Sequence, residues 1–522
     1  MPRRLAEPAF RLDRSVGRPL TVQLSDALRE AMSGGTLASG ERLPSSRALA
    51  AQLGVSRTVV TEAYQQLYAE GWLEGRHGSG TFVAEHSAPP SASGPPAAAD
   101  GHGTSGHTAP GHATRGSGGT SGPGAPSATD RHGALSTTAT PTVRATAPRP
   151  SREQARHQGM IDLRPGAPWV RDHDRAAWRR AWRHAAEQPL DEDPDPRGLP
   201  RLRALLAGHL RRTRGVRIGP ENVMVTRGTG NGLDLVGAAL LGAGTRAGVE
   251  EPGYQKARTI LAARGAHVLP CPVDHDGILT EHLPGDLSLV HTTPAHQYPL
   301  GGRLPIPRRE RLLAWARQSA AMVVEDDYDA EFRYDVAPLP ALYGLDPDRV
   351  ILLGTLSKTL SPDLGIGWIV AEPPLLERLA AVRHDLSDRT SVPTQAATAL
   401  LLERGDLDRH LRRMRLEYAR RRAMLIDLLT TRPTGDTAGL HVLLPLPARA
   451  VAPVVAEAAE RGVLVDDTSR ASHGAPTVHG LILGYGSAHP ADLRRACAVL
   501  NEAVARHTGR VSPGGEGASG PA

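Results

Sequence analysis

The sequence predicts a multidomain protein in which a small N-terminal α+β domain, a disordered linker and a larger C-terminal α/β domain follow one another. Residues 1–86 contain two short helical patterns and then two strand patterns. Residues 87–158 consist largely of Gly, Ser, Pro, Ala and Thr, and residues 159–510 alternate short apolar strands with helices. We expect the final residues, 511–522, to form a disordered tail.

Bulk composition narrows the class of protein. A chain of 522 residues is long enough for more than one core, and its net charge of +6 permits nucleic-acid binding without proving it. The N-terminus lacks the apolar run of a signal peptide, and 18 uninterrupted apolar residues occur nowhere, so we expect a cytoplasmic protein without membrane spans. Cys271 and Cys497 lie far apart and indicate neither a disulfide framework nor a zinc site.

The N-terminal domain has the pattern of a winged helix-turn-helix. Apolar residues at four-residue intervals predict a helix over 19–33, and Ser45 can cap a second helix that ends at Gly54. Another helix starts near Ser56 and ends before Gly71. The segment after it, with its glycine-rich tip, predicts two strands that form a wing.

The linker composition predicts disorder. No Phe, Trp or Tyr occurs between Phe82 and Trp169, so this stretch cannot bury enough apolar surface to offset the entropy of ordering it. Its histidines are irregularly spaced, and we expect no metal site from them.

In the C-terminal domain, strands alternate with helices, which predicts a mostly parallel sheet covered on both faces. We expect helices over 200–213, 231–241, 253–264 and 307–319, and strands over 222–226, 247–250, 288–293, 321–325 and 350–354. Ligands bind beside the carboxyl ends of strands in such sheets. The residues that follow each strand are therefore the candidates for a site.

Lys358 is the first candidate, because the chain contains only two lysines, Lys256 and Lys358. It follows an apolar strand and lies among hydroxyl side chains that include Thr355 and Ser357. An amine in this position suits a Schiff base beside a phosphate.

Other strand ends supply groups that complement this amine. A glycine-rich turn over 227–232 opens a helix that can hold a phosphate, and Tyr254 offers a ring for stacking. Asp326 can pair with a pyridinium nitrogen, with Asp327 as the alternative if the register differs, and Tyr328 can contact a ring oxygen. Together with the amine, this set predicts a pyridoxal 5'-phosphate site.

Residues 18–84 resemble the winged-helix DNA-binding domain of the GntR family, through RPLTVQLSDALREAM, RLPSSRALAAQLGVSRTVVTEAYQQLYAEGWLE and GSGTFV. The resemblance implies an operator of double-stranded DNA. It places the start of the last helix, Ser56, Arg57 and Thr58, in the major groove, with Arg57 as the base-contacting residue. It also implies a backbone contact for Arg47 and a minor-groove approach of the wing at His77 and Gly78.

Residues from about 161 to 507 resemble a fold-type I aminotransferase, and the whole chain resembles the MocR/GabR family of transcriptional regulators. This resemblance implies that Lys358 forms the Schiff base and that the cofactor sites of a homodimer lie near the subunit interface. The other roles that it implies are Asp326 at the pyridine nitrogen, Tyr328 at the ring hydroxyl, Tyr254 as the stacking ring, and Gly228, Thr229, Thr355 and Ser357 at the phosphate.

Three positions depart from the family pattern. Gly365 stands where relatives commonly carry a phosphate-binding arginine, and Asp193 lies near the place of a tyrosine that reaches the partner subunit's cofactor. Residues 480–485 supply no arginine for a substrate carboxylate, for which Arg470 and His479 are nearby substitutes.

The sequence therefore predicts a DNA-binding regulator whose aminotransferase-like domain senses pyridoxal phosphate, an amine or an amino acid, with transaminase turnover weak or absent. Two alternatives stay open. One is a working aminotransferase with an appended DNA-binding domain, and the other is a DNA-binding protein whose second domain binds no cofactor.

Overall fold

The computed structural model describes residues 12–15, 17–76, 80–84, 149–336 and 339–509. The expected tail, most of the expected linker, and His77 and Gly78 in the wing lie outside the described residues. Both domains have the predicted architecture.

Three helices and a two-stranded sheet form the N-terminal domain: α1 (Leu20–Ser33), α2 (Ser46–Leu53), α3 (Arg57–Glu70), β1 (Leu73–Arg76) and β2 (Gly80–Val83). The predicted caps are present, since the Ser45 side chain accepts a hydrogen bond from the Ala48 amide and the Ser56 side chain accepts one from the Val59 amide. The helices bury Leu24, Leu28, Leu49, Val60 and Leu67 in one core. These elements constitute a winged helix-turn-helix.

A short helix precedes the aminotransferase-like domain. This helix, α4 (Arg152–His157), lies before residue 159, where we expected ordered structure to begin. Its first residue is anchored, because Arg152 forms an ion pair with Asp162 and donates hydrogen bonds to the carbonyls of Arg164 and Pro165. These long-range contacts leave no compositional signal in the linker.

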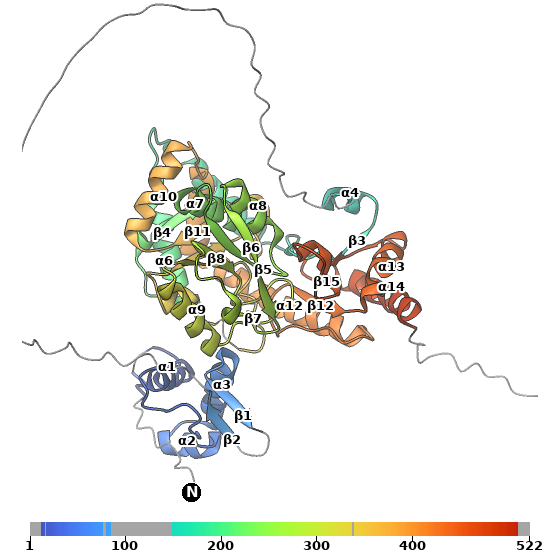
Figure 1. Ribbon diagram of the computed structural model, residues 1–522. Coiled ribbons are helices and arrows are strands. Elements are labelled where there is room, and N and C mark those ends of the chain that lie inside the picture. The colour runs from blue at the N-terminus through green and yellow to red at the C-terminus, as the bar shows by residue number, and fades with distance from the viewer. Residues whose placement is uncertain (1–11, 16, 77–79, 85–148, 337–338, 510–522) are drawn as a thin grey trace, which may run out of the picture. The chain divides into compact units, whose positions relative to one another are not determined.

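The C-terminal domain is built on an eight-stranded sheet with the order β4-β11-β10-β9-β8-β5-β6-β7 (Figure 1). The pairs β10–β9, β9–β8, β8–β5 and β5–β6 are parallel, and β11 and β7 are antiparallel to their neighbours. The strands are β4 (Val223–Thr226), β5 (Arg246–Glu251), β6 (His267–Asp274), β7 (Gly277–Ile278), β8 (Leu289–Thr292), β9 (Met322–Asp327), β10 (Val350–Thr355) and β11 (Gly367–Val370).

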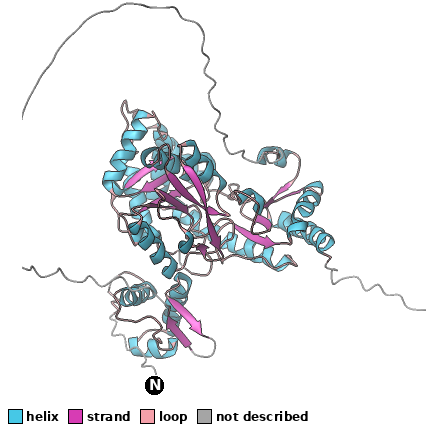
Figure 2. Ribbon diagram, in the orientation of Figure 1, coloured by secondary structure: helices cyan, strands magenta, loops and turns pink. Residues whose placement is uncertain are grey.

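Helices cover both faces of this sheet, as the periodicity predicts (Figure 2). Side chains of β10 alternate between two cores: Val350 and Leu352 lie in one, and Ile351 and Leu353 in the other. The core of Ile351 includes residues of α7 (Thr229–Leu240), α8 (Gln255–Ala263) and α10 (Pro373–Asp385). The core of Val350 includes residues of α5 (Arg175–Ala186), α6 (Pro200–Arg214), α9 (Ile306–Gln318), α11 (Val392–Glu403) and α12 (Asp406–Leu428).

A smaller part of the C-terminal domain contains a three-stranded antiparallel sheet. Its order is β12 (His441–Pro445), β15 (Gly480–Gly484) and β14 (Asp466–Asp467). The helices α13 (Ala448–Glu460) and α14 (Pro490–Thr508) accompany it, and β13 (Val463–Leu464) pairs with β3 (Ile161–Asp162), which follows α4. The chain segment after α4 is thereby tied to the C-terminal end of the domain.

Candidate cofactor and DNA-binding sites

Lys358 lies in the loop that follows β10, as predicted, and its side chain is partly buried. Its Nζ donates a 2.6 Å hydrogen bond to the carbonyl of Gly166. Burial lowers the pKa of this amine, and the positive charges of Arg152 and Lys256 act in the same direction, while the charges of Asp329 and Asp326 oppose the shift. A lowered amine pKa favours the nucleophilic form.

Asp326 lies at the end of the neighbouring strand β9 and is buried. His291 on β8 lies 3.3 Å from its Oδ2 through Nε2, so the imidazole donates to the carboxylate. Asp327 points to the opposite face of the strand, where the Arg214 side chain donates a 2.6 Å hydrogen bond to it. Of the two acids considered from the sequence, Asp326 is therefore the one that neighbours the lysine loop and the tyrosines.

The two tyrosines come from the loops after β5 and β9. The Tyr254 ring lies nearly parallel to the His291 ring, with an interplanar angle of 27° and a centroid distance of 6.5 Å. The Tyr328 hydroxyl donates a 2.9 Å hydrogen bond to the His296 carbonyl. Burial raises the pKa of both phenols, and the Asp326 charge contributes to both shifts. Both hydroxyls are therefore protonated near neutral pH and can donate hydrogen bonds.

The turn after β4 has the form of an anion cradle. Gly228 has a φ of 111° and begins α7 without a side-chain cap, so the first amides of the helix are open to a ligand. A Cβ at Gly228 would lie 3.5 Å from Thr355 Oγ1 and 3.9 Å from Ser357 Oγ. Those two hydroxyls are 3.0 Å apart, so the structure brings together the two segments predicted to contact a phosphate.

The residues fit pyridoxal phosphate by two observations. Asp326 is bonded to His291, whose ring is stacked with that of Tyr254, and its charge also acts on the amine of Lys358 and the phenol of Tyr328. In addition, Asp326 Oδ1 is buried and has no hydrogen-bond partner among the residues that the structure describes. A buried carboxylate oxygen in this state is poised to accept a hydrogen bond from a bound group.

The structure shows the surroundings of the three positions that depart from the family pattern. Gly365 has a φ of 56°, and a Cβ there would meet nothing within 4 Å, so the place of the missing arginine is open space. Asp193 borders a surface pocket with Asp191 and Asp195. On β15, Ile482 is fully buried in an apolar cluster with Leu300, Leu443 and Ala471.

Arg470, one of the two substitutes suggested for a carboxylate-binding arginine, forms an ion pair of 3.5 Å with Asp466. Its charge also acts on Tyr298, whose ring lies 6.5 Å from that of Tyr254. Arg470 is thus near the aromatic wall of the site, although a carboxylate already neutralises it. His479 lies just before β15.

The predicted DNA-contacting residues that the structure describes are all exposed on the N-terminal domain. Ser56, Arg57 and Thr58 are exposed at the start of α3, and Arg47 is exposed in the first turn of α2. The Arg57 Nε lies 3.3 Å from Ser46 Oγ, which holds the guanidinium beside the turn between the two helices. This position matches that of a recognition-helix arginine.

Four residues that the sequence did not single out hold the candidate cofactor-site residues in place. His291 orients Asp326, and Gly166 receives the lysine amine. Glu250 accepts hydrogen bonds from Thr292, Thr293 and Gln297 and so joins strand β5 to the end of β8 and the loop after it. The His296 carbonyl accepts from the Tyr328 hydroxyl. His291 and Glu250 occur inside apolar strands, and only the alternation of side chains about those strands could have indicated them.

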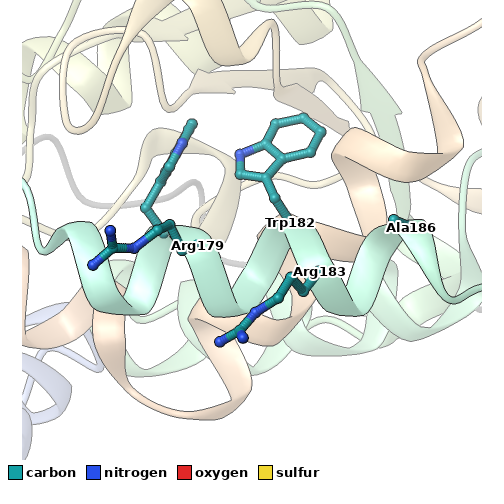
Figure 3. A pocket seen from close by; sticks show the side chains of 5 residues that line it. Arg179, Trp182, Arg183 and Ala186 are labelled. Atoms are coloured by element: carbon teal, nitrogen blue, oxygen red, sulfur yellow. The ribbon is translucent and has the colours of Figure 1, made fainter.

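A cavity elsewhere in the domain lies over α5. Its lining residues are Trp178, Arg179, Trp182, Arg183 and Ala186 (Figure 3). No residue of the predicted cofactor site borders it. Among the described residues, the longest apolar helical stretches fall short of what a membrane-spanning helix requires.

Comparison with known protein families agrees with the folds of both the N-terminal and the C-terminal domain. Residues 20–83 match the gntR family of bacterial regulatory proteins, and residues 160–498 match aminotransferase class I and II. The class of protein is therefore a gntR-type DNA-binding domain fused to an aminotransferase domain.

The chain belongs to the MocR family of helix-turn-helix transcriptional regulators. It is 34% identical over 491 residues to the pyridoxine biosynthesis transcriptional regulator PdxR of Corynebacterium glutamicum, a match that covers 93% of this chain and 96% of that protein. It is 35% identical over 506 residues to the probable rhizopine catabolism regulatory protein MocR of Rhizobium meliloti, covering 94% of this chain and 95% of that protein.

Among solved structures, the α-aminoadipate aminotransferase LysN of Thermus thermophilus superposes with a TM-score of 0.62 at 25% identity. The match covers 70% of this chain and 96% of LysN. That structure is a complex with N-(5'-phosphopyridoxyl)-L-leucine. The predicted fold-type I architecture of the C-terminal domain is thereby confirmed.

Proposed function

We propose that this regulator binds pyridoxal 5'-phosphate at Lys358 and senses the cofactor, or an amine or amino acid that reacts with it, to control DNA binding. The observation that carries the proposal is the buried Oδ1 of Asp326, which has no hydrogen-bond partner among the described residues, while Oδ2 is bonded to the His291 ring that stacks with Tyr254. The similarity to PdxR, a regulator of pyridoxine biosynthesis by its name, supports cofactor sensing. MocR is named as a probable regulator of rhizopine catabolism, which supports a small-molecule effector other than the cofactor.

Each residue would have a separate task toward the cofactor, which supplies an aldehyde for the amine and an electron-accepting ring. Lys358 would hold the aldehyde carbon, and Asp326, oriented by His291, would hold the proton on the ring nitrogen. Tyr254 would stack on the ring and Tyr328 would donate to its oxygen. The amides of Gly228 and Thr229 and the hydroxyls of Thr355 and Ser357 would bind the phosphate.

We further propose that the protein is a cytoplasmic homodimer that binds a two-part operator, with Arg57 as its main base contact. Effector binding would shift the population of dimers between geometries that fit and do not fit the operator. The exposed position of Ser56, Arg57 and Thr58 on α3 supports the DNA contact.

The cofactor assignment is tested by comparing the two lysines. We expect the purified protein, incubated with pyridoxal phosphate and desalted, to keep the visible absorption of the covalently bound cofactor. Lys358→Ala should lose this absorption and Lys256→Ala should keep it, because Lys256 is exposed on α8 and contacts none of the other site residues by a hydrogen bond in the described structure. Equal absorption in both variants would refute the site.

A second candidate function is transamination, which the intact set of Lys358, Asp326 and Tyr328 supports. The apolar cluster around Ile482 weighs against efficient binding of a substrate carboxylate. Single-turnover mixing of the cofactor-loaded protein with a panel of amino acids decides between the two. Conversion of the bound cofactor within seconds would favour an enzyme, and binding without conversion would favour a sensor.

A further inference from the structure

Three buried side chains form a cluster beside the cofactor site. They are His296 in the loop after β8, Asp329 in the loop after β9, and His441, the first residue of β12. Asp329 accepts a hydrogen bond from His296 Nδ1, with its oxygens 3.0 and 3.2 Å away. The rings of His296 and His441 lie 4.7 Å apart, so the cluster joins the large sheet to the small one.

A metal site is the first alternative for such a cluster. Each of the three side chains offers one ligand atom, and these atoms lie within 4.8 Å of one another. Tetrahedral ligands at about 2.0–2.1 Å from zinc would be only about 3.3 Å apart. Because His296 Nδ1 is already bonded to Asp329, the arrangement fits a hydrogen-bonded network better than a metal centre.

The network contacts Tyr328 and acts on Lys358 through its charge. The Tyr328 hydroxyl donates to the His296 carbonyl at 2.9 Å and lies 3.1 Å from His296 Nδ1. On the other side, four charged groups act on the Lys358 amine: the carboxylates of Asp329 and Asp326, and the cations of Arg152 and Lys256. Asp329 exerts the largest of these four charge effects.

We propose that Asp329 and His296 are positioning residues for the cofactor site. Asp329 fixes the His296 ring, and this ring, whose Nδ1 lies 3.1 Å from the Tyr328 hydroxyl, holds that hydroxyl in place. Asp329 is also the carboxylate with the largest charge effect on the Lys358 amine. This inference rests on the proposed function for its biological meaning, but its first test needs no cofactor. It extends the site from the strand ends to the small sheet that carries His441.

The effect of Asp329 on the Lys358 amine can be tested by amine labelling, because the chain contains only two lysines. In the full-length cofactor-free protein, a trace amine-reactive reagent can modify only Lys256, Lys358 and the N-terminal amine, and mass spectrometry quantifies each separately. The labelling midpoint of Lys358 along a pH series reports its protonation, and exposed Lys256 serves as the internal reference. Loss of a negative charge near an amine destabilises its ammonium form.

We expect Asp329→Asn to move the Lys358 midpoint to lower pH, which is read as a several-fold rise in labelling at fixed pH. Lys256 should not change. The matched control is Asp363→Asn, which removes an exposed carboxylate from the same loop and should leave both midpoints in place. An equal Lys358 midpoint in the two variants would overturn the role of Asp329.

The role of His296 is tested by a double-mutant cycle on cofactor affinity. If His296 acts through the Tyr328 hydroxyl, His296→Asn should weaken binding several-fold in the wild-type background and hardly at all in Tyr328→Phe. Asp329→Asn serves as a second variant in the same cycle, should His296→Asn fold poorly. Additive losses would mean a merely structural role and would contradict the inference.

The same measurements distinguish the positioning role from a metal site and from a failure of the proposed cofactor binding. If micromolar zinc alters Lys358 labelling in the wild type but not in Asp329→Asn, the cluster is a metal site and the positioning role is wrong. If the labelling shift occurs and no variant or wild-type protein binds pyridoxal phosphate, the proposed function fails while the charge relationship between Asp329 and Lys358 stands.

Discussion

The Lys358 amine donates its 2.6 Å hydrogen bond to the carbonyl of Gly166, a residue 192 positions earlier in the chain. Arg152 holds the turn that contains this carbonyl, because its guanidinium binds the carbonyls of Arg164 and Pro165 directly before Gly166. The segment that enters the C-terminal domain is therefore in contact with the amine proposed to bind the cofactor.

Substitution of Gly166 should disturb this contact. Gly166 has a φ of 90°, and a Cβ there would lie 2.9 Å from Lys358 Nζ. We expect Gly166→Ala to destabilise the domain by about 1–3 kcal/mol and to weaken cofactor binding, because the backbone is strained and the amine is displaced. Urea unfolding and a spectroscopic cofactor titration measure the two effects.

Gly474→Ala is the control for that experiment. Gly474 is exposed and lacks a positive φ, and a Cβ added there would meet no atom within 4 Å. It should change neither stability nor affinity. A Gly166→Ala protein that behaves like this control would contradict the importance of the turn.

Substitutions of Asp326 and Asp327, which are adjacent in β9, should have different effects. Asp327→Asn leaves buried Arg214 without its charge partner, so we expect a loss of about 3–5 kcal/mol in the free energy of unfolding. Asp326→Asn should instead weaken pyridoxal phosphate binding with a smaller effect on stability. Urea unfolding beside cofactor titration separates the two, and the reverse pattern would exchange the assignments.

His410 predicts a pH dependence of stability. Burial lowers its pKa from 6.5 to about 4, and its Nε2 donates to the carbonyl of Thr359, next to Lys358. Since the unfolded state binds the proton first as pH falls, stability should drop by about 3 kcal/mol between pH 6.5 and 4 from this residue alone. His410→Gln should flatten unfolding curves over this interval, whereas an unchanged slope would show that the ring titrates normally.

Two arginines of the N-terminal domain should separate specific from general DNA binding. Arg57→Ala should cost about 1–3 kcal/mol on a selected operator and less on random duplex DNA, because a base contact is lost. Arg47→Ala should weaken both alike and reduce the salt slope by about one, as expected for a phosphate contact. Fluorescence anisotropy at several salt concentrations measures both, and equal losses for Arg57→Ala would assign it to phosphate.

The sequence was sufficient where local patterns decide structure. Ser45 and Ser56 marked the starts of helices, and apolar runs located five strands of the large sheet. The strands β6, β7 and β11 were not predicted, because β6 is only partly buried and contains two prolines, β7 has only two residues, and β11 contains a tryptophan after a glycine. None of the three has the uniform apolar run of a central parallel strand.

The candidate site also contains residues that local sequence patterns indicate and residues that depend on distant contacts. Lys358, Tyr328 and Tyr254 follow strands and Asp326 lies at the end of one, and the set of their chemical groups together with the family resemblance made them candidates. Gly166, His291, His296 and Asp329 could not be predicted in this way, because their roles depend on contacts between distant segments. The anchoring of Arg152 is of the same kind, and it explains why helix α4 forms inside a segment whose composition indicates disorder.

Strand β9 carries Asp326 and Asp327 on opposite faces, and this arrangement restricts how the chain can change length. Deletion or insertion of one residue ahead of the strand end would turn Asp326 away from His291 and, in the same event, separate Asp327 from Arg214. A single insertion or deletion would thus remove Asp326 from the candidate site and also leave the buried charges of Asp327 and Arg214 without partners. Length variation among members of this family should therefore be absent from β9 and concentrated in the connections between elements.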